Sequence, residues 1–131
     1  MIENAWAKTR RDHAAESAED YVEAIFRLEQ ESQSVRLSDL AERFGVSAPT
    51  VSKLLSRLES RGLVHVEPRS HVELTEEGLR LAEQSLERHT VVVAFLEKIG
   101  VSPAQAELDS EGIEHHVSEE TLAAMKRFLV D

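Results

Sequence analysis

Residues 37–58 read LSDLAERFGVSAPTVSKLLSRL, and this stretch decides the fold. Two short helical patterns meet at Gly45, a residue typical of a helix C-terminus. The second pattern begins with Ser47 as a candidate N-cap and has Pro49 in its first turn, where a missing N–H does no harm. Two helices with so short a connection predict a helix-turn-helix.

A β-hairpin is predicted directly after the second helix. Two β-biased runs, 63–66 and 72–74, flank a turn segment that contains Pro68 and Arg69. A hairpin in this position is the wing of a winged helix. The pattern therefore predicts a winged helix-turn-helix domain over residues 17–74.

Helical patterns also precede and follow this module. A first helix is expected to begin near Ser17, where Ser17 and Asp20 resemble a capping box. The extension at 1–16 before it shows no clear periodicity and is expected to be partly disordered. The fold class is therefore mainly α, an N-terminal winged helix-turn-helix followed by a C-terminal all-helical dimerisation domain at 75–131.

Three helices are predicted in that C-terminal domain. A long one is capped by Thr75 and stops before Gly100, a second runs from Ser102 to about His116, and a third begins at Ser118. We expect the dimer to form through the apolar residues of these helices, including Leu122, Met125, Phe128 and Leu129.

The second helix of the helix-turn-helix presents small and polar side chains, a composition that favours DNA binding over a role in protein contacts alone. Its N-terminal residues are expected to meet base edges, while hydroxyl and basic groups contact phosphates. One such module supplies limited surface, so a homodimer on palindromic double-stranded operator DNA is expected. The predicted DNA-binding residues are Ser47, Ala48, Pro49, Thr50, Ser52, Lys53, Arg57 and Arg69.

Charge and composition limit the possible functions. The net charge is −10, yet residues 1–70 carry 10 basic and 12 acidic side chains, whereas residues 71–131 carry 5 and 13. The absence of cysteine excludes disulfides and thiolate metal sites. No apolar run approaches a membrane span and no signal peptide is recognisable, so a cytoplasmic protein without membrane contact is expected.

Carboxylates and histidines cluster in two segments of the sequence. Asp20 and Glu23 share a polar helix face, while a run at 109–116 places carboxylate and imidazole groups at i, i+3 and i+4. His89 lies beside the apolar seam of the long helix. Taken singly, Asp20 with Glu23 and His89 are more typical of a cap, a solvated face or a hydrogen-bonded helix histidine than of a metal site, and the 109–116 run is also compatible with an exposed acidic face. Oxygen and imidazole donors without sulfur suit Mn²⁺ or Fe²⁺.

The helix-turn-helix with its wing, the Arg88-His89 pair and the run EGIEHH at 111–116 together resemble the manganese transport regulator (MntR) family of the diphtheria-toxin-repressor superfamily. The resemblance extends from about Ser17 to Asp131. It implies a site for two Mn²⁺ ions per subunit, with Fe²⁺, Zn²⁺ or Cd²⁺ as possible substitutes. The implied ligands are Asp20, Glu23, His89, Glu111, Glu114 and His115.

The resemblance further implies a repressor of manganese-uptake genes that binds its operator when metal joins the first helix to the dimerisation half. Iron-responsive members of the superfamily carry methionine at the position that matches Asp20. They also carry an additional C-terminal SH3-like domain that does not match any part of this chain. Both differences favour manganese over iron. Two alternatives stay open: a metal-independent winged-helix regulator that answers a small organic ligand, and a di-metal hydrolase. No side chain is evident as a nucleophile, so an enzyme is not expected.

Overall fold

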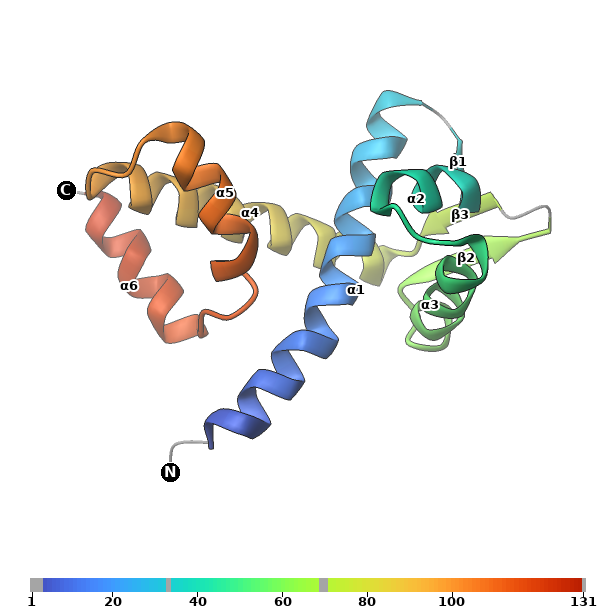
Figure 1. Cartoon of the computed structure of the whole chain (residues 1–131), viewed down its shortest axis with the longest axis horizontal. Coiled ribbons are helices and arrows are strands. Elements are labelled where there is room, and N and C mark those ends of the chain that lie inside the picture. Colours follow the sequence, from blue (N-terminus) through green and yellow to red (C-terminus); the bar gives the residue numbers. More distant parts are fainter. Residues whose placement is uncertain (1–3, 33, 69–70, 131) are drawn as a thin grey trace. The chain divides into compact units, whose positions relative to one another are not determined.

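The computed structural model describes residues 4–32, 34–68 and 71–130, apart from the side chains of residues 8–17. The chain divides into two compact units, Ser17–Glu83 on the one hand and Met1–Glu16 with Gln84–Asp131 on the other. The predicted class, mainly helical with a small winged sheet, is confirmed (Figure 1). In chain order the elements are α1 (Ala5–Glu31), β1 (Val35–Arg36), α2 (Leu37–Phe44), α3 (Ala48–Ser60), β2 (Val64–Glu67), β3 (His71–Leu74), α4 (Glu76–Lys98), α5 (Pro103–Ile113) and α6 (Glu119–Val130).

The first helix is much longer than the sequence suggested. We expected it to begin near Ser17 after a partly disordered extension, and that expectation is wrong, because α1 begins at Ala5. The Asn4 side chain accepts the Ala7 N–H over 3.0 Å and so caps the helix. Neither glycine nor proline interrupts residues 5–31. Ser17 therefore lies inside the helix rather than at its N-cap position.

The helix-turn-helix follows the predicted pattern closely. Gly45 adopts a left-handed conformation (φ 64°) at the end of α2, and the Ser47 hydroxyl accepts the Thr50 N–H at the start of α3. Arg36 stands at the N-cap of α2. The Asp39 carboxylate accepts the Arg36 N–H over 2.9 Å, which fixes the start of the helix at Leu37.

The wing belongs to a three-stranded antiparallel sheet in the order β1-β3-β2, drawn side by side in Figure 1. Val66 pairs with Val72 across the hairpin, and Val35 pairs with Val72 on its other side. The two-residue strand β1 was not predicted, because its pairing depends on a partner 36 or so positions away and leaves no local pattern. The sheet therefore anchors the start of α2.

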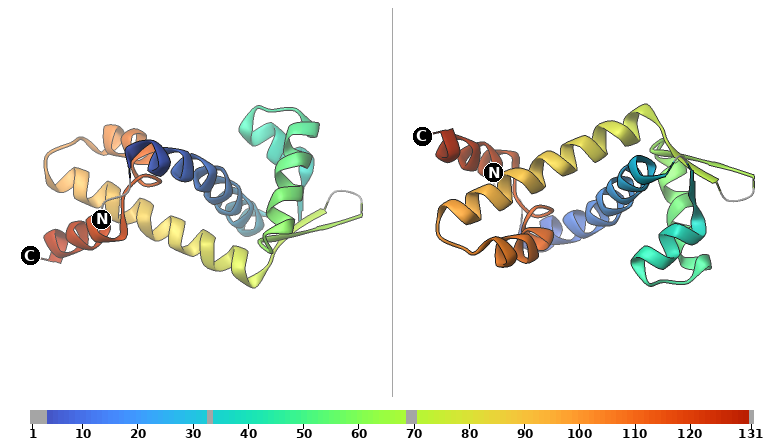
Figure 2. Two further views of the ribbon diagram at one scale, coloured as in Figure 1. Left: turned by 90° about the horizontal axis from the view of Figure 1, so that it is seen from below. Right: turned by 90° about the horizontal axis from the view of Figure 1, so that it is seen from above.

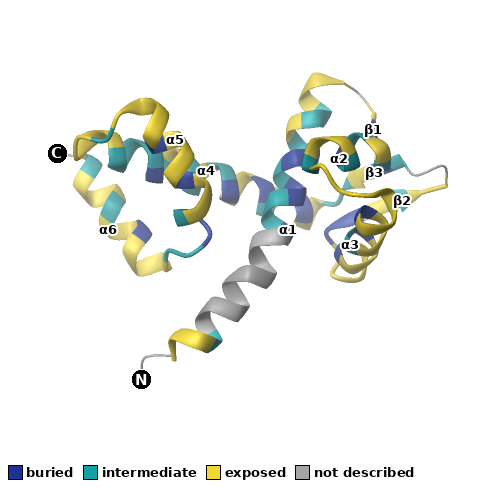
Figure 3. Cartoon of the chain, viewed as in Figure 1, coloured by how far each residue is buried: buried dark blue, intermediate teal, exposed yellow. Residues whose placement is uncertain are grey.

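One hydrophobic core holds the unit Ser17–Glu83 together. Tyr21 of α1 stacks on Phe44 of α2 with ring centroids 4.3 Å apart. Figure 3 shows the buried stretches on the inner faces of α1 and α3. Each fully buried aliphatic side chain contributes about 1.5–3 kcal/mol to folding. The least exposed members of this core are Val22, Ile25, Val35, Leu40, Val51, Leu55, Val72 and Ala82.

In the C-terminal unit, α5 and α6 both lie beside the second half of α4 (Figures 1 and 2). Phe95 of α4 meets Phe128 of α6 edge to face, with centroids 5.3 Å apart. We expected α5 to reach His116, but it ends at Ile113. Glu114 keeps helical backbone angles as the C-cap, while the next residues form a turn. None of the helices that the described residues form has the length and apolar character of a membrane span.

Candidate metal centre and nucleic-acid interface

A buried carboxylate lies at the centre of the C-terminal unit. The side chain of Glu114 is 1% exposed, and each of its oxygens faces an imidazole nitrogen. His89 Nδ1, from α4, lies 2.7 Å from Glu114 Oε2, while His115 Nε2 lies 3.5 Å from Oε1. The Ser110 hydroxyl is 3.3 Å from His89 Nδ1. A buried charge of this kind needs either positive partners or a cation.

The other ring nitrogen of His89 also meets a carboxylate. His89 Nε2 lies 2.9 Å from Glu107 Oε2 on α5, so the ring joins two acidic side chains. Burial alone would lower the pKa of His89, but the hydrogen bonds and charges of Glu114 and Glu107 outweigh it and the pKa rises. A protonated His89 ring would balance the charge of these carboxylates, and a divalent cation could do the same.

Arg88 fixes the turn that carries Glu114 and His115. Its guanidinium donates to the backbone carbonyl oxygens of Glu114 (3.2 Å) and Val117 (3.1 Å), and it pairs with the Glu119 carboxylate over 2.6 Å. Carbonyl groups at a helix end have no partner within the helix. Arg88 therefore explains why α5 stops early and where the turn lies relative to α4.

The structure brings together three of the six predicted ligands, His89, Glu114 and His115. Glu111 is exposed on α5, one turn before Glu114. Glu107 was missed, although its spacing to Glu111 (i, i+4) and Glu114 (i, i+7) places all three on one helix face and could have indicated it.

Asp20 and Glu23 lie three residues apart on α1, in the unit Ser17–Glu83, and both are partly buried. Glu23 Oε1 accepts a hydrogen bond from Arg27 over 2.9 Å. The participation of these two carboxylates in the metal site stays a prediction.

The predicted DNA-binding residues of the helix-turn-helix form an exposed face. The Ser47 hydroxyl, which caps α3, lies 2.9 Å from the Thr50 hydroxyl, so the two hydroxyl groups are hydrogen-bonded to each other. Arg69, predicted at the tip of the wing, lies outside the described residues. The remaining residues of the set are exposed along the first three turns of α3: Ala48, Pro49, Ser52, Lys53 and Arg57.

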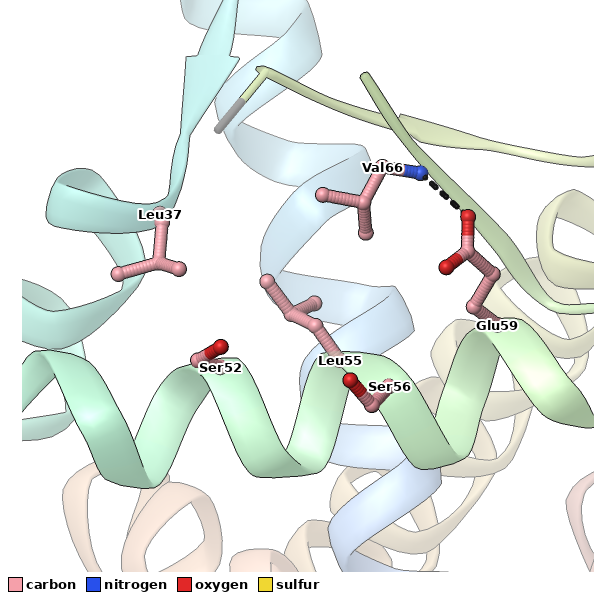
Figure 4. Close-up of a pocket in the computed structure, with 6 residues that line it drawn as sticks. All are labelled: Leu37, Ser52, Leu55, Ser56, Glu59 and Val66. Carbon is pink, nitrogen blue, oxygen red and sulfur yellow. Dashed lines mark hydrogen bonds between the residues drawn. The ribbon is translucent and has the colours of Figure 1, made fainter. Parts of the chain in front are cut away.

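A small hollow of about 160 Å³ separates α3 from the wing (Figure 4). At its far end, Glu59 Oε2 accepts the Val66 N–H of the edge strand β2 over 3.0 Å and lies 3.6 Å from His65 Nδ1. This carboxylate ties α3 to the wing.

Two family models together cover nearly the whole chain. The model "Iron dependent repressor, N-terminal DNA binding domain" matches residues 13–72. The model "Iron dependent repressor, metal binding and dimerisation domain" matches residues 75–131. The transcriptional regulator MntR of Escherichia coli O157:H7 is 50% identical over 121 residues, which are 92% of this chain and 78% of that protein. The chain belongs to the MntR family of iron-dependent repressors.

Further relatives agree with this assignment. MntR of Listeria monocytogenes (strain HCC23) is 36% identical over 102 residues, covering 78% of this chain and 72% of that protein. A solved structure described as "Manganese-dependent transcriptional repressor complex with manganese" is 34% identical with a TM-score of 0.76, and the match covers 86% of this chain. The manganese regulator SloR is 27% identical with a TM-score of 0.73. The chain spans about half the length of these two solved proteins, 52% and 53%.

The family is one of transcriptional regulators. The prediction of a DNA-binding regulator rather than a hydrolase is therefore confirmed. The chain accordingly has a DNA-binding domain and a metal-binding and dimerisation domain.

The chemistry of the donor set fits a hard or borderline divalent cation. Among the described residues, no three His, Asp or Glu side chains are already arranged as a coordination sphere. Two imidazoles nevertheless converge on one buried carboxylate, and the chain has no cysteine. Such donors suit Mn²⁺ or Fe²⁺. His89, Glu114 and His115 are the residues of this cluster that would hold such a cation.

Proposed function

We propose that this protein is a manganese-responsive repressor that binds palindromic operator DNA as a homodimer and controls manganese uptake genes. The observation that carries the proposal is the pair of imidazoles, His89 and His115, held on the buried Glu114 carboxylate. The names of the relatives support the choice of manganese, since both the 50% and the 36% identical proteins are called MntR.

Two Mn²⁺ ions per subunit are proposed, with Fe²⁺, Zn²⁺ or Cd²⁺ as possible substitutes. The bound ion would supply positive charge that neutralises the acidic cluster. The carboxylates of α1 would contribute oxygen ligands, and hard oxygen donors such as Asp20 favour manganese over softer metals. The proposed ligands are Asp20, Glu23, His89, Glu111, Glu114 and His115.

Metal is proposed to act by preorganisation. Ligands from both domains would limit the freedom of the DNA-binding domain relative to the dimerisation domain. Less conformational entropy would then be lost when the dimer binds both halves of a palindrome. Lys53 and Arg57 are proposed to contact phosphates, Ala48, Pro49 and Thr50 to lie against base edges, and Ser47, Ser52 and Arg69 to complete the backbone contacts.

The dimer interface is proposed to lie on the C-terminal unit. We expected Leu122 to contribute, but it is 6% exposed and packs inside its own unit. Phe128 remains a candidate at 45% exposure, and Ile99, Leu108 and Val130 present more apolar surface than the sequence suggested. Exposed apolar residues gathered on one unit are typical of an interaction surface.

The test is a DNA-mobility titration on fragments that the Mn²⁺-loaded protein selects from a random-sequence pool. Binding should appear with Mn²⁺, disappear with chelator, and be lost or weakened by at least tenfold in Glu111→Ala. Glu97→Ala, which removes an exposed carboxylate of α4, is the matched control and should bind like the wild type.

Two results would contradict the proposal. Binding that persists in chelator would indicate a metal-independent regulator. Metal-dependent binding that survives in Glu111→Ala would show that the ligand assignment is wrong.

A further inference from the structure

His89 has a carboxylate within 3.0 Å of each of its ring nitrogens. The two carboxylates differ sharply in their surroundings. Glu114, on the Nδ1 side, is 1% exposed and also contacts His115, whereas Glu107, on the Nε2 side, is 59% exposed. The two sides of the imidazole ring are therefore chemically distinct.

A divalent cation needs several donors at once. On the Nδ1 side of His89, the Glu114 carboxylate and the His115 imidazole are already gathered. On the Nε2 side, Glu107 is the carboxylate within reach, and it faces solvent. The metal is thus expected at Nδ1, which leaves Nε2 to carry a proton.

A histidine that binds metal through one nitrogen commonly donates the N–H of the other to a carboxylate, which fixes the tautomer and the ring orientation. Here Glu107 Oε2 lies 2.9 Å from His89 Nε2, within the range of a charge-assisted hydrogen bond. We propose that Glu107 is a positioning residue that accepts the His89 Nε2–H and so presents Nδ1 to the metal. This inference rests on the proposed metal-binding function.

Glu107 is also connected to His89 through Ser110. Its backbone carbonyl oxygen accepts the Ser110 hydroxyl over 2.9 Å, and that hydroxyl lies 3.3 Å from His89 Nδ1. Ser110 is fully buried. The α5 turn that carries Glu107 is therefore connected to both sides of the ring, and the carboxylate can hold the ring without being a ligand.

The direct test is a ¹⁵N spectrum of the His89 ring in full-length protein loaded with ¹¹³Cd²⁺, a diamagnetic probe. We expect ¹¹³Cd coupling at Nδ1 and a protonated Nε2. In Glu107→Ala the coupling should remain at Nδ1, whereas the Nε2–H signal should be lost to exchange with water. A purely structural role for Glu107 would not alter that signal. Coupling at Nε2 in the wild type would overturn the proposal.

A second measurement uses Mn²⁺ alone, with free ion counted by its paramagnetic resonance. Loss of a carboxylate that orients a metal-binding histidine weakens binding by about 10–100-fold. We expect a weakening in that range for Glu107→Ala, a smaller one for Glu107→Gln, whose amide oxygen still accepts, and none for Glu97→Ala. Equal affinity in wild type and Glu107→Ala would overturn the inference while leaving the proposed function intact. A wild type that binds neither Mn²⁺ nor Cd²⁺ would overturn both.

Discussion

The Arg88 guanidinium donates a hydrogen bond to the backbone carbonyl oxygen of Glu114 over 3.2 Å. The next residue in the chain, His89, contacts the side chain of the same glutamate. Adjacent residues of α4 therefore hold the backbone and the carboxylate of Glu114, the C-cap residue of α5. This double attachment couples the stability of the turn at 114–118 to the geometry of the metal centre.

Arg88→Met is expected to destabilise the protein and to weaken metal binding. It leaves two carbonyl oxygens without their charged donor, which costs about 2 kcal/mol of unfolding free energy. Urea denaturation in chelator measures the loss of stability, and Mn²⁺ titration measures the weaker affinity. The control is Arg80→Met, because Arg80 is exposed and pairs with Glu77 within its own helix, where such pairs contribute about 0.5 kcal/mol or less. Similar losses in both variants would refute the role of Arg88.

Gly78→Ala is expected to destabilise the winged-helix unit. A Cβ at this position of α4 would collide with the backbone carbonyl oxygen of Leu63 and crowd the Leu74 side chain. Overpacking of this kind costs about 1–3 kcal/mol. The control is Gly112→Ala, where the Cβ would meet open space and the helix should gain up to about 1 kcal/mol. Thermal unfolding of the two variants should therefore shift in opposite directions.

Glu29→Gln is expected to stabilise the protein at neutral pH. Burial and the nearby charge of Glu73 raise the pKa of Glu29 above its usual 4.5, and His71 offsets part of this effect. A raised carboxyl pKa means that the folded state prefers the protonated form, so its stabilising contribution is complete at low pH and is lost as the pH rises through that pKa. The gain at pH 7 should be about 0.5 kcal/mol or less, because Glu29 is partly solvated.

Unfolding curves recorded from pH 3 to pH 8 test this prediction. The advantage of Glu29→Gln over the wild type should shrink toward zero as the pH falls below 4. Glu31→Gln removes an exposed carboxylate from the same helix and should show no comparable trend. An advantage that grows on acidification would have the wrong sign.

Lys53→Ala is expected to weaken DNA binding without changing sequence preference. A lost phosphate contact lowers affinity on all sequences and reduces the dependence of log K on log salt by about one per site. Mobility shifts at several salt concentrations measure that slope. A change in the preferred sequence, with an unaltered slope, would show that Lys53 reads bases instead.

Leu108→Glu is expected to dissociate the dimer. Leu108 is 69% exposed on α5, and a charge buried in an apolar interface is strongly disfavoured. Sedimentation at several protein concentrations should reveal monomer. Leu79→Glu, which alters a 39% exposed leucine of the winged-helix unit, should leave the dimer intact. Dimers of equal affinity in both variants would place the interface elsewhere.

The sequence by itself determined the helix-turn-helix, the hairpin and most helix ends. Ser47, Ser102 and Ser118 cap helices that follow them, and Gly45 closes α2, because each signal acts over three or four residues. The prediction for the extension at 1–16 was wrong, because its weak periodicity gave no sign of the continuous helix that Asn4 caps.

Only the tertiary structure decided which residues far apart in the sequence come into contact. The pairing of β1 with β3, the early end of α5 under Arg88, and the approach of Glu107 to the far side of His89 all join residues 18 to 37 or so positions apart. Such contacts depend on how the elements pack rather than on local spacing. A motif can therefore indicate that a metal site exists, while the packing of α4 against α5 determines how its histidine is held.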